Sequence, residues 1–251
     1  MKVYFIGAGP GDPELITIKG ARLIGEATVV IYAGSLVPER VLEHASDDAV
    51  IMNSASMNLD EVCAVYNEYR DSDITIARVH TGDPSIYGAI GEQIAYLREE
   101  GIPFQVIPGV SSFQASAAVL EQELTLPSVS QSVILSRISG RTPTPEKEDL
   151  ALLAKAQATM ILFLSIGMAK EVEEKLLKEY PPKTPVAIVY RASWPDQKVF
   201  RGTLDELAKI TEDNSLTRQA LIFVGEVLNN EFELSKLYDA SFTHGYRKGN
   251  A

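Results

Sequence analysis

Three short glycine-rich segments each join an expected strand to an expected helix, and they are the first candidates for chemistry in this sequence. In the segment 7–13, Gly-Ala-Gly-Pro-Gly-Asp-Pro, the glycines permit close backbone approach, Asp12 is placed to cap the following helix and Pro13 suits its first turn. Free N–H groups at a helix N-terminus favour negative charge, so the segment suits a nucleotide or a carboxylate. A tight turn without a ligand explains the same residues.

A dinucleotide site is disfavoured at this first segment. The glycine spacing is Gly-x-Gly-x-Gly instead of G-x-G-x-x-G, and Pro10 lacks the N–H group that would donate to a phosphate. The second expected strand ends in 32–35, Tyr-Ala-Gly-Ser, which offers no carboxylate to a ribose. A P-loop is excluded as well, because no Lys-Ser or Lys-Thr follows the glycines.

The second segment, 78–88, contains the residues best suited to acid–base chemistry. Asp83 either caps the next helix or binds the positive charge of a ligand. His80 is either a general base or a structural residue at the end of a strand. In a parallel sheet this segment and 7–13 lie at the same carboxyl edge, where α/β proteins bind ligands.

Two further segments close expected strands. The segment 106–113, Val-Ile-Pro-Gly-Val-Ser-Ser-Phe, places Ser111 and Ser112 at a helix start, either as N-caps or as ligand contacts. No G-x-S-x-G elbow surrounds these serines, so a hydrolase triad is disfavoured. The apolar segment 161–165 either lines an adenine pocket or packs in a core.

The pattern of strands and helices around these segments indicates an α/β fold. In the first half, short apolar runs alternate with helical patterns of the length that parallel crossovers require. The runs are apolar on both faces, which favours a mostly parallel sheet covered by helices on each side. The expected strands are 3–6, 28–32, 49–52, 74–79 and 104–107, and the expected helices are 13–26, 38–45, 59–70 and 86–100.

The second half predicts another α/β domain, in this case with a mixed sheet. Only 191–197 separates the expected strands 185–190 and 198–202, and this spacing is typical of a hairpin. We therefore expect domains at 1–122 and 123–251. The polar segment 141–148 is either a mobile lid or a connector. The other expected strands are 132–136, 159–164 and 221–227, with helices at 112–121, 145–156, 168–180 and 204–211.

The composition limits the classes of function. The chain has 34 acidic residues against 23 Lys and Arg, a net charge of −11, which argues against a nucleic-acid binder because such proteins neutralise phosphates. Local arginines still allow an anionic small molecule to bind. The single Cys63 excludes internal disulfides, and the scattered His44, His80 and His244 make a zinc site unexpected. We expect no membrane partner and a cytoplasmic location, because no apolar run reaches membrane length and no signal-peptide pattern precedes the first strand.

Taken in order, these segments resemble the tetrapyrrole (corrin and porphyrin) methylase family. The resemblance implies two αβα domains, with S-adenosylmethionine as methyl donor and S-adenosylhomocysteine as its product. Because the positive sulfur already activates the methyl group, we expect no metal on the enzyme. It also implies a homodimer, a cofactor cleft between the domains and a substrate side on the N-terminal domain. The similar segments are 7–20, 80–88, 107–113, 185–193, 197–204 and 220–227, which together extend over nearly the whole chain.

Part of the sequence resembles one branch of that family. The segments 31–38, 80–83 and 235–247 are similar to the enzymes that methylate carbon 11 of precorrin-4 or cobalt-precorrin-4 in cobalamin biosynthesis. Two alternatives stay open, namely a family member that methylates a different ring carbon and a non-catalytic nucleotide-binding regulator. The sequence does not decide whether the substrate carries cobalt.

These interpretations assign roles to individual residues. Alkylation of a ring carbon needs an acid or base, for which the candidates are His80, Tyr32 and Tyr87. A substrate with many carboxylates needs local cations, so we expect at least two arginines at the mouth of the site, from Arg78, Arg137, Arg141, Arg191 and Arg247. The expected substrate contacts are Tyr32, Gly34, Ser35, Arg78, Arg137 and Arg247. The cofactor contacts that the resemblance implies are Pro10, Thr81, Gly82, Asp83, Ile86, Ser111, Ser112, Leu164, Ala192, Ala220, Leu221 and Ile222.

Overall fold

The computed structural model describes residues 1–34, 36–229, 233, 235, 239–248 and 250. The chain divides into two compact units, of which the first contains 1–115 and 192–196 and the second contains 116–191 and 197–251. The division therefore falls at 115/116, whereas the sequence pattern predicts a boundary at 122/123. The short segment 192–196 belongs to the first unit, although the chain on either side of it belongs to the second.

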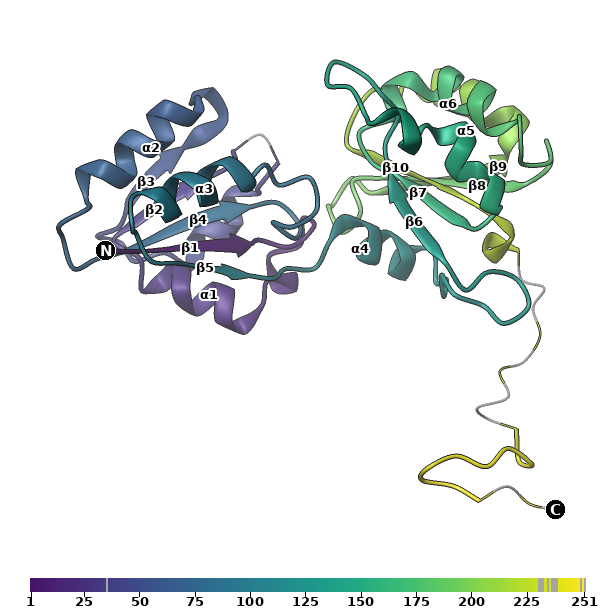
Figure 1. Ribbon diagram of the computed structural model, residues 1–251, viewed down its shortest axis with the longest axis horizontal. Helices are drawn as coiled ribbons and strands as arrows, with labels where there is room; N and C mark the ends of the chain where they lie inside the picture. The colour runs from purple at the N-terminus through teal and green to yellow at the C-terminus, as the bar shows by residue number, and fades with distance from the viewer. Residues whose placement is uncertain (35, 230–232, 234, 236–238, 249, 251) are drawn as a thin grey trace. The chain divides into compact units, whose positions relative to one another are not determined.

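The first unit is built on a parallel five-stranded sheet in the order β3-β2-β4-β1-β5 (Figure 1). Its central strands consist largely of buried Val, Ile and Phe residues, so the sheet requires cover on both faces. This confirms the parallel α/β arrangement expected for the first half. The strands are β1 (Lys2–Gly7), β2 (Val29–Tyr32), β3 (Val50–Asn53), β4 (Thr75–His80) and β5 (Phe104–Ile107).

Helices cover both faces of this sheet. Apolar side chains of α1 and the 3-10 helix η2 pack on one face, and those of α2 and α3 pack on the other. Because side chains alternate along a strand, Arg78 and His80 of β4 follow the core residue Ile76 on the α2/α3 face. Two polar side chains are therefore buried near the carboxyl end of β4. The helix bounds are α1 (Ile18–Gly25), η2 (Glu39–His44), α2 (Leu59–Glu68) and α3 (Gly91–Glu99), with a short η3 (Ser54–Ser56).

The helix expected over 13–26 consists of two elements. The carboxylate of Asp12 accepts a hydrogen bond from the N–H of Glu14 and caps the 3-10 helix η1 (Pro13–Leu15). The hydroxyl of Thr17 then accepts from a backbone N–H and starts α1. A second cap inside the expected range therefore divides the helix.

The helix expected from residue 86 begins only at Gly91. Tyr87 and Ala89 have φ values of 55° and 50°, in the left-handed region, and this backbone conformation cannot continue a right-handed helix. Residues 81–90 therefore form a loop that returns from the sheet edge to α3.

The second unit contains a mixed sheet in the order β6-β7-β10-β8-β9 (Figure 1). The strands β6 and β7 are parallel, while β10 pairs antiparallel with both β7 and β8. The antiparallel pairing of β8 with β9 confirms the expected hairpin. The strands are β6 (Val133–Ser136), β7 (Thr159–Leu162), β8 (Pro185–Tyr190), β9 (Lys198–Thr203) and β10 (Ala220–Val224).

Helices α5, α6 and α7 supply the apolar core that covers one face of the second sheet. The helix expected over 145–156 is broken into three short elements, and the strand expected over 221–227 ends at Val224, before Gly225 with its φ of 140°. The bounds are α4 (Ser112–Val119), η4 (Glu146–Glu148), α5 (Leu150–Leu153), η5 (Ala154–Ala156), η6 (Ile166–Met168), α6 (Ala169–Leu176), η7 (Leu204–Glu206), α7 (Leu207–Asp213) and η8 (Glu226–Leu228).

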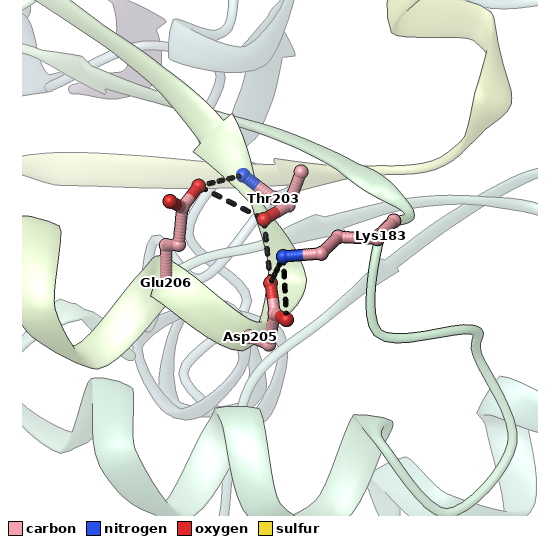
Figure 2. A network of polar contacts seen from close by, with 4 residues as sticks. All are labelled: Lys183, Thr203, Asp205 and Glu206. Atoms are coloured by element: carbon pink, nitrogen blue, oxygen red, sulfur yellow. Dashed lines mark hydrogen bonds and ion pairs between the residues drawn. The ribbon is translucent and has the colours of Figure 1, made fainter.

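An exposed polar network joins the end of β9 to η7 (Figure 2). The hydroxyl of Thr203 shares its one proton between the carboxylates of Asp205 and Glu206, and Lys183 pairs with Asp205 at 2.9 Å. None of the helices in the described ranges is both long and apolar enough to cross a membrane.

Candidate functional site

The three glycine segments meet at the carboxyl edge of the first sheet, where the neighbouring strands β4, β1 and β5 end. A Cβ added to Gly7 would lie 2.5 Å from the carbonyl oxygen of Gly82 and 2.6 Å from the Cα of Gly109. A Cβ added to Gly109 would overlap the same Gly82 carbonyl. The glycines are therefore required because three loops pack backbone to backbone, which is a stronger constraint than a turn alone.

Hydrogen bonds lock the first two loops together. The N–H of Gly82 donates to the carbonyl of Gly9 at 2.7 Å, and the N–H of Gly9 donates to Gly82 at 3.3 Å. Both residues have positive φ, 80° and 61°, which glycine adopts without steric cost. The N–H of Ala8 also donates to the carbonyl of His80 at 2.7 Å, so the loops continue the pairing of β1 with β4.

Asp83 ties the second loop to the third. One carboxylate oxygen accepts hydrogen bonds from the N–H and the hydroxyl of Ser85, and the other accepts from the N–H of Gly109 at 2.9 Å. Partial burial acts to raise the pKa of Asp83, but the bonds from Ser85 and Gly109 outweigh it and hold the pKa below its ordinary value. Asp83 therefore places a fixed negative charge at the sheet edge, and it caps its own turn as well.

The serines of the third loop start α4 beside the second loop. The N–H of Ser111 donates to the side chain of Gln114 at 2.9 Å, and Ser111 is buried. A Cβ added to Gly82 would lie in ordinary contact with the Cα of Ser111, at 3.6 Å. The sheet edge thus brings together six of the expected cofactor contacts, which are Pro10, Thr81, Gly82, Asp83, Ser111 and Ser112.

His80 lies under the second loop with only 5% of its surface exposed. Burial and the nearby positive charge of Arg78 lower its pKa to about 3, although a hydrogen bond to the backbone of Gly88 acts in the opposite direction. The imidazole is therefore neutral near pH 7. Its Nε2 atom has no hydrogen-bond partner in the part of the chain that the structure describes.

Arg78, a second residue of β4 that the sequence singles out, belongs to a buried network. Its Nε donates to the side-chain oxygen of Gln93 at 3.2 Å, and its guanidinium reaches the carbonyl of Ile31 at 3.4 Å. The hydroxyl of Tyr66 donates to the same Gln93 oxygen at 2.8 Å. Burial lowers the pKa of Arg78 and raises that of Tyr66. No ion pair within the described ranges involves Arg78, and its guanidinium donates to the neutral acceptors of Gln93 and Ile31.

This network also fixes the second loop. The side-chain N–H of Gln93 donates to the carbonyl of Ala89 at 3.3 Å, and His80 bonds the adjacent Gly88. Between these anchors and Asp83, Tyr87 is 46% exposed on a left-handed backbone. Strained backbone of this kind persists only where the surrounding structure determines it, and it clusters at functional sites.

In the second unit, Leu164 has the features of a ligand contact. It is 67% exposed and has a φ of 52°, both unusual for a leucine. The hydroxyl of the buried Ser165 donates to the carbonyl of Phe163 at 2.6 Å and accepts from the N–H of Ile138 at 2.9 Å. These bonds fix the backbone next to Leu164, whose side chain remains exposed. The other expected contacts in this unit, Ala220, Leu221 and Ile222, form the start of β10 and are buried.

The remaining sequence candidates are dispersed. Arg137 donates to the backbone carbonyls of Thr142 and Pro143, so it supports the polar segment 141–148, and Arg247 bonds carbonyls of its own segment. Tyr32 is buried at the end of β2, and Gly34 lies against the side-chain amide of Asn53. Ser35 lies outside the described residues. Ile86 lies in the second loop, and Arg141 is exposed in the polar segment.

Two residues that the sequence analysis does not assign contact the first glycine loop. The indole N–H of Trp194 donates to the carbonyl of Pro10 at 2.9 Å, and the hydroxyl of Ser193 accepts from the N–H of Asp12 at 3.0 Å. They lie beside the expected contact Ala192, which is buried in the first unit. The signal in the sequence is the single tryptophan of the chain, placed in a turn between hairpin strands.

Comparisons with known proteins identify relatives that match nearly the whole chain. The family model described as Tetrapyrrole (Corrin/Porphyrin) Methylases matches residues 2–208. The chain is 53% identical over 251 residues to the cobalt-precorrin-4 C(11)-methyltransferase of Methanocaldococcus jannaschii, with 99% of this chain and 97% of the relative covered. It is 49% identical over 250 residues to the precorrin-4 C(11)-methyltransferase of Pseudomonas aeruginosa, with coverages of 99% and 100%.

Solved structures show the same fold. The X-ray structure of a cobalt-precorrin-4 methyltransferase, described as a cobalamin biosynthetic enzyme, has a TM-score of 0.88 and 43% identity, covering 91% of this chain and 96% of that one. The uroporphyrin-III C-methyltransferase of Thermus thermophilus in complex with S-adenosylhomocysteine has a TM-score of 0.78 and 30% identity, covering 91% and 99%.

Proposed function

The chain belongs to the tetrapyrrole (corrin/porphyrin) methylase family, and we propose that it transfers a methyl group from S-adenosylmethionine to carbon 11 of precorrin-4 or cobalt-precorrin-4 in cobalamin biosynthesis. Similarity to the two C(11)-methyltransferases over nearly the whole chain supports the reaction and the ring position. The structural observation that supports a cofactor site is the backbone packing of Gly7, Gly82 and Gly109 at one edge of the sheet.

The residues at this edge suit S-adenosylmethionine. The glycines let the three loops pack backbone to backbone, and this packing brings Pro10, Asp83 and Ser111 to one edge of the sheet. The ionised Asp83 offers negative charge to a sulfonium cation. We propose that Pro10, Thr81, Gly82, Asp83, Ile86, Ser111 and Ser112 hold the cofactor. The contacts expected at Leu164, Ala192, Ala220, Leu221 and Ile222 stay predictions from the family resemblance.

The chain's own contribution to the reaction is orientation. When bound, S-adenosylmethionine supplies a methyl group activated by positively charged sulfur, and its transfer to a ring carbon releases S-adenosylhomocysteine. Holding the acceptor carbon, the methyl group and the sulfur in line can contribute ~7–11 kcal/mol to the rate. The interlocked loops suit this role because Gly9, Gly82 and Asp83 are fixed by hydrogen bonds to neighbouring loops.

The three acid–base candidates differ in what they can do. His80 is buried and neutral, so it can accept a hydrogen bond at Nε2 but carries no charge near pH 7. Tyr32 is buried as well, whereas nearly half of Tyr87 is exposed. We propose that Tyr87 contacts the substrate and that His80 supports it through the backbone of Gly88.

The substrate is an anionic macrocycle, and the chain has a net charge of −11, so local cations must hold the substrate's carboxylates. We propose that at least two of Arg78, Arg137, Arg141, Arg191 and Arg247 do so, together with Tyr32, Gly34 and Ser35. Substrate affinity should then fall as salt rises, because ions screen these pairs. A homodimer in the cytoplasm is also part of this proposal, and light scattering on the purified protein tests the dimer.

Product analysis tests the function. The purified protein is incubated with S-adenosylmethionine carrying a ¹³C-labelled methyl group and with either metal-free or cobalt-loaded precorrin-4. We expect one labelled methyl group at carbon 11 of the product, located by NMR, from at least one of the two substrates. Label at another ring carbon would show that the enzyme is a methyltransferase for a different position of the macrocycle. Absence of label from both substrates would show that the proposed function is wrong.

A further inference from the structure

The turn between β8 and β9 packs in the first unit, although both strands belong to the second unit. Two residues with left-handed backbone, Arg191 with φ 47° and Ser193 with φ 68°, stand on either side of Ala192. Such conformations are costly for residues other than glycine and persist only when the surrounding contacts determine them. The contacts of Ser193 and Trp194 therefore identify the segment that determines the conformation of this turn.

Both residues hold the first glycine loop. The indole Nε1–H of Trp194 donates to the carbonyl of Pro10 at 2.9 Å, across 184 positions of sequence. The hydroxyl of Ser193 accepts the N–H of Asp12 at 3.0 Å. Pro10 has no N–H, so its carbonyl is its only backbone hydrogen-bonding group, and Trp194 binds it.

The indole ring also packs directly on Gly11. A Cβ added to Gly11 would overlap the Cδ1 and Nε1 atoms of Trp194, and these atoms lie near the base of a rigid side chain. Gly11 does not have positive φ, so it is the ring, and not the backbone conformation, that requires glycine there. The loop is thus fixed on one side by the bonds between Gly9 and Gly82 and on the other by Trp194 and Ser193.

We propose that Trp194 and Ser193 are positioning residues for the methyl donor, and that they set the conformation of residues 9–12 to which S-adenosylmethionine binds. This inference rests on the proposed function, because it takes the first glycine loop as a cofactor contact. The two residues act through Pro10, Gly11 and Asp12, so they govern cofactor affinity and not the methyl-transfer step. A fixed loop binds more tightly because little conformational freedom is lost on binding.

The first test is Trp194→Phe, which keeps an aromatic ring over Gly11 and removes the N–H donor. We expect the dissociation constant for S-adenosylhomocysteine, measured by calorimetry, to rise about threefold to tenfold, the range of one hydrogen bond. The KM for S-adenosylmethionine should rise by the same factor, with kcat unchanged at saturation. The matched control is Tyr96→Phe on α3, a partly buried aromatic residue of the same unit that also loses one polar group. It should bind like the wild type.

A double-mutant cycle tests the packing. Gly11→Ala should weaken S-adenosylhomocysteine binding by at least tenfold in the wild type, because the new methyl group overlaps the indole. In the Trp194→Ala background the same change should weaken binding by less than about twofold, because the space has been vacated. Additive effects of the two changes would contradict direct contact as the cause.

The outcomes separate this inference from the proposed function. If the wild type binds S-adenosylhomocysteine and Trp194→Phe binds it equally well, the positioning role is wrong. A lower kcat with an unchanged KM also contradicts it, since that result indicates either a lost transition-state interaction or a loss of active protein, and not weaker cofactor binding. If the wild type binds ATP or NAD but not S-adenosylhomocysteine, both the proposed cofactor and this inference are overturned.

Discussion

Two polar networks, one in each unit, differ in burial and in the sequence distance that they span. In the first unit, Tyr66, Arg78 and Gln93 lie inside the protein on three elements, and their groups bond one another and the backbone. In the second unit, Lys183, Thr203, Asp205 and Glu206 lie at the surface, and three of the four are within three residues of one another (Figure 2).

The difference shows which contacts the fold depends on. Water replaces a lost partner at the surface, so the exposed network contributes little even though its geometry is good. A buried group that loses its partner bears the full cost of desolvation. The first network also holds the loop that contains Asp83 and Tyr87, through Ala89. The second network joins the end of β9 and the segment before β8 to η7. The enclosed network therefore connects stability to the candidate site.

The largest effect is expected from Gly109→Ala, at the enclosed sheet edge. The added methyl group would overlap the Gly82 carbonyl, and backbone cannot move as a side chain can. We expect the free energy of unfolding to fall by about 3 kcal/mol or more in urea titrations, with S-adenosylhomocysteine binding lost. The control Gly91→Ala, with nothing within 4 Å of the added atom, should leave both unchanged or slightly stabilise α3. Equal behaviour of the two variants would contradict backbone packing.

The next effect concerns the buried network itself. Gln93→Leu removes the acceptor shared by Tyr66 and Arg78, and we expect it to lower the free energy of unfolding by about 3 kcal/mol. Adding Arg78→Met removes the stranded charge, so the double variant should be more stable than the sum of the single effects predicts. Strict additivity would show that the two side chains are not coupled.

The third prediction concerns pH. His80 has a folded-state pKa of about 3, below the ordinary value of 6.5, so its stabilising contribution is complete above pH 6.5 and is lost as pH falls toward 3. From pH 7 to pH 5 this group alone should remove about 2 kcal/mol from the free energy of unfolding. His80→Gln should flatten that part of the profile, while His44→Gln, at an exposed position, should keep the wild-type slope. Parallel profiles for all three proteins would show that His80 is not buried as described.

The smallest effect is expected at the exposed network. Lys183→Ala breaks the pair with Asp205, yet both groups are solvated, so Tm should change by less than about 2 °C. A comparable exposed lysine, Lys178, gives the matched control as Lys178→Ala. A much larger change in Tm for Lys183→Ala alone would show that the exposed network stabilises the fold as strongly as the buried one.

The contrast between local contacts and contacts across a long sequence distance also explains which features the sequence predicts. Both sheets, the hairpin of β8 with β9 and the three glycine segments follow from local patterns of apolar residues and turn formers. The late start of α3 does not, because His80 of β4 bonds the backbone of Gly88 in the preceding loop. Trp194 could not be assigned either, since its partner Pro10 lies 184 residues away. The spacing of residues predicts local turns and caps, whereas contacts between distant segments can be identified only from the folded structure.

One measurement tests the central claim most directly, which is that the glycine edge of the first sheet binds the methyl donor. The protein is crystallised with S-adenosylhomocysteine, and the position of the ligand is determined. We predict that the ligand contacts Pro10 and residues 81–83, with its sulfur toward the Asp83 loop. A ligand bound away from this edge, or crystals that stay empty at saturating concentration, would contradict the account.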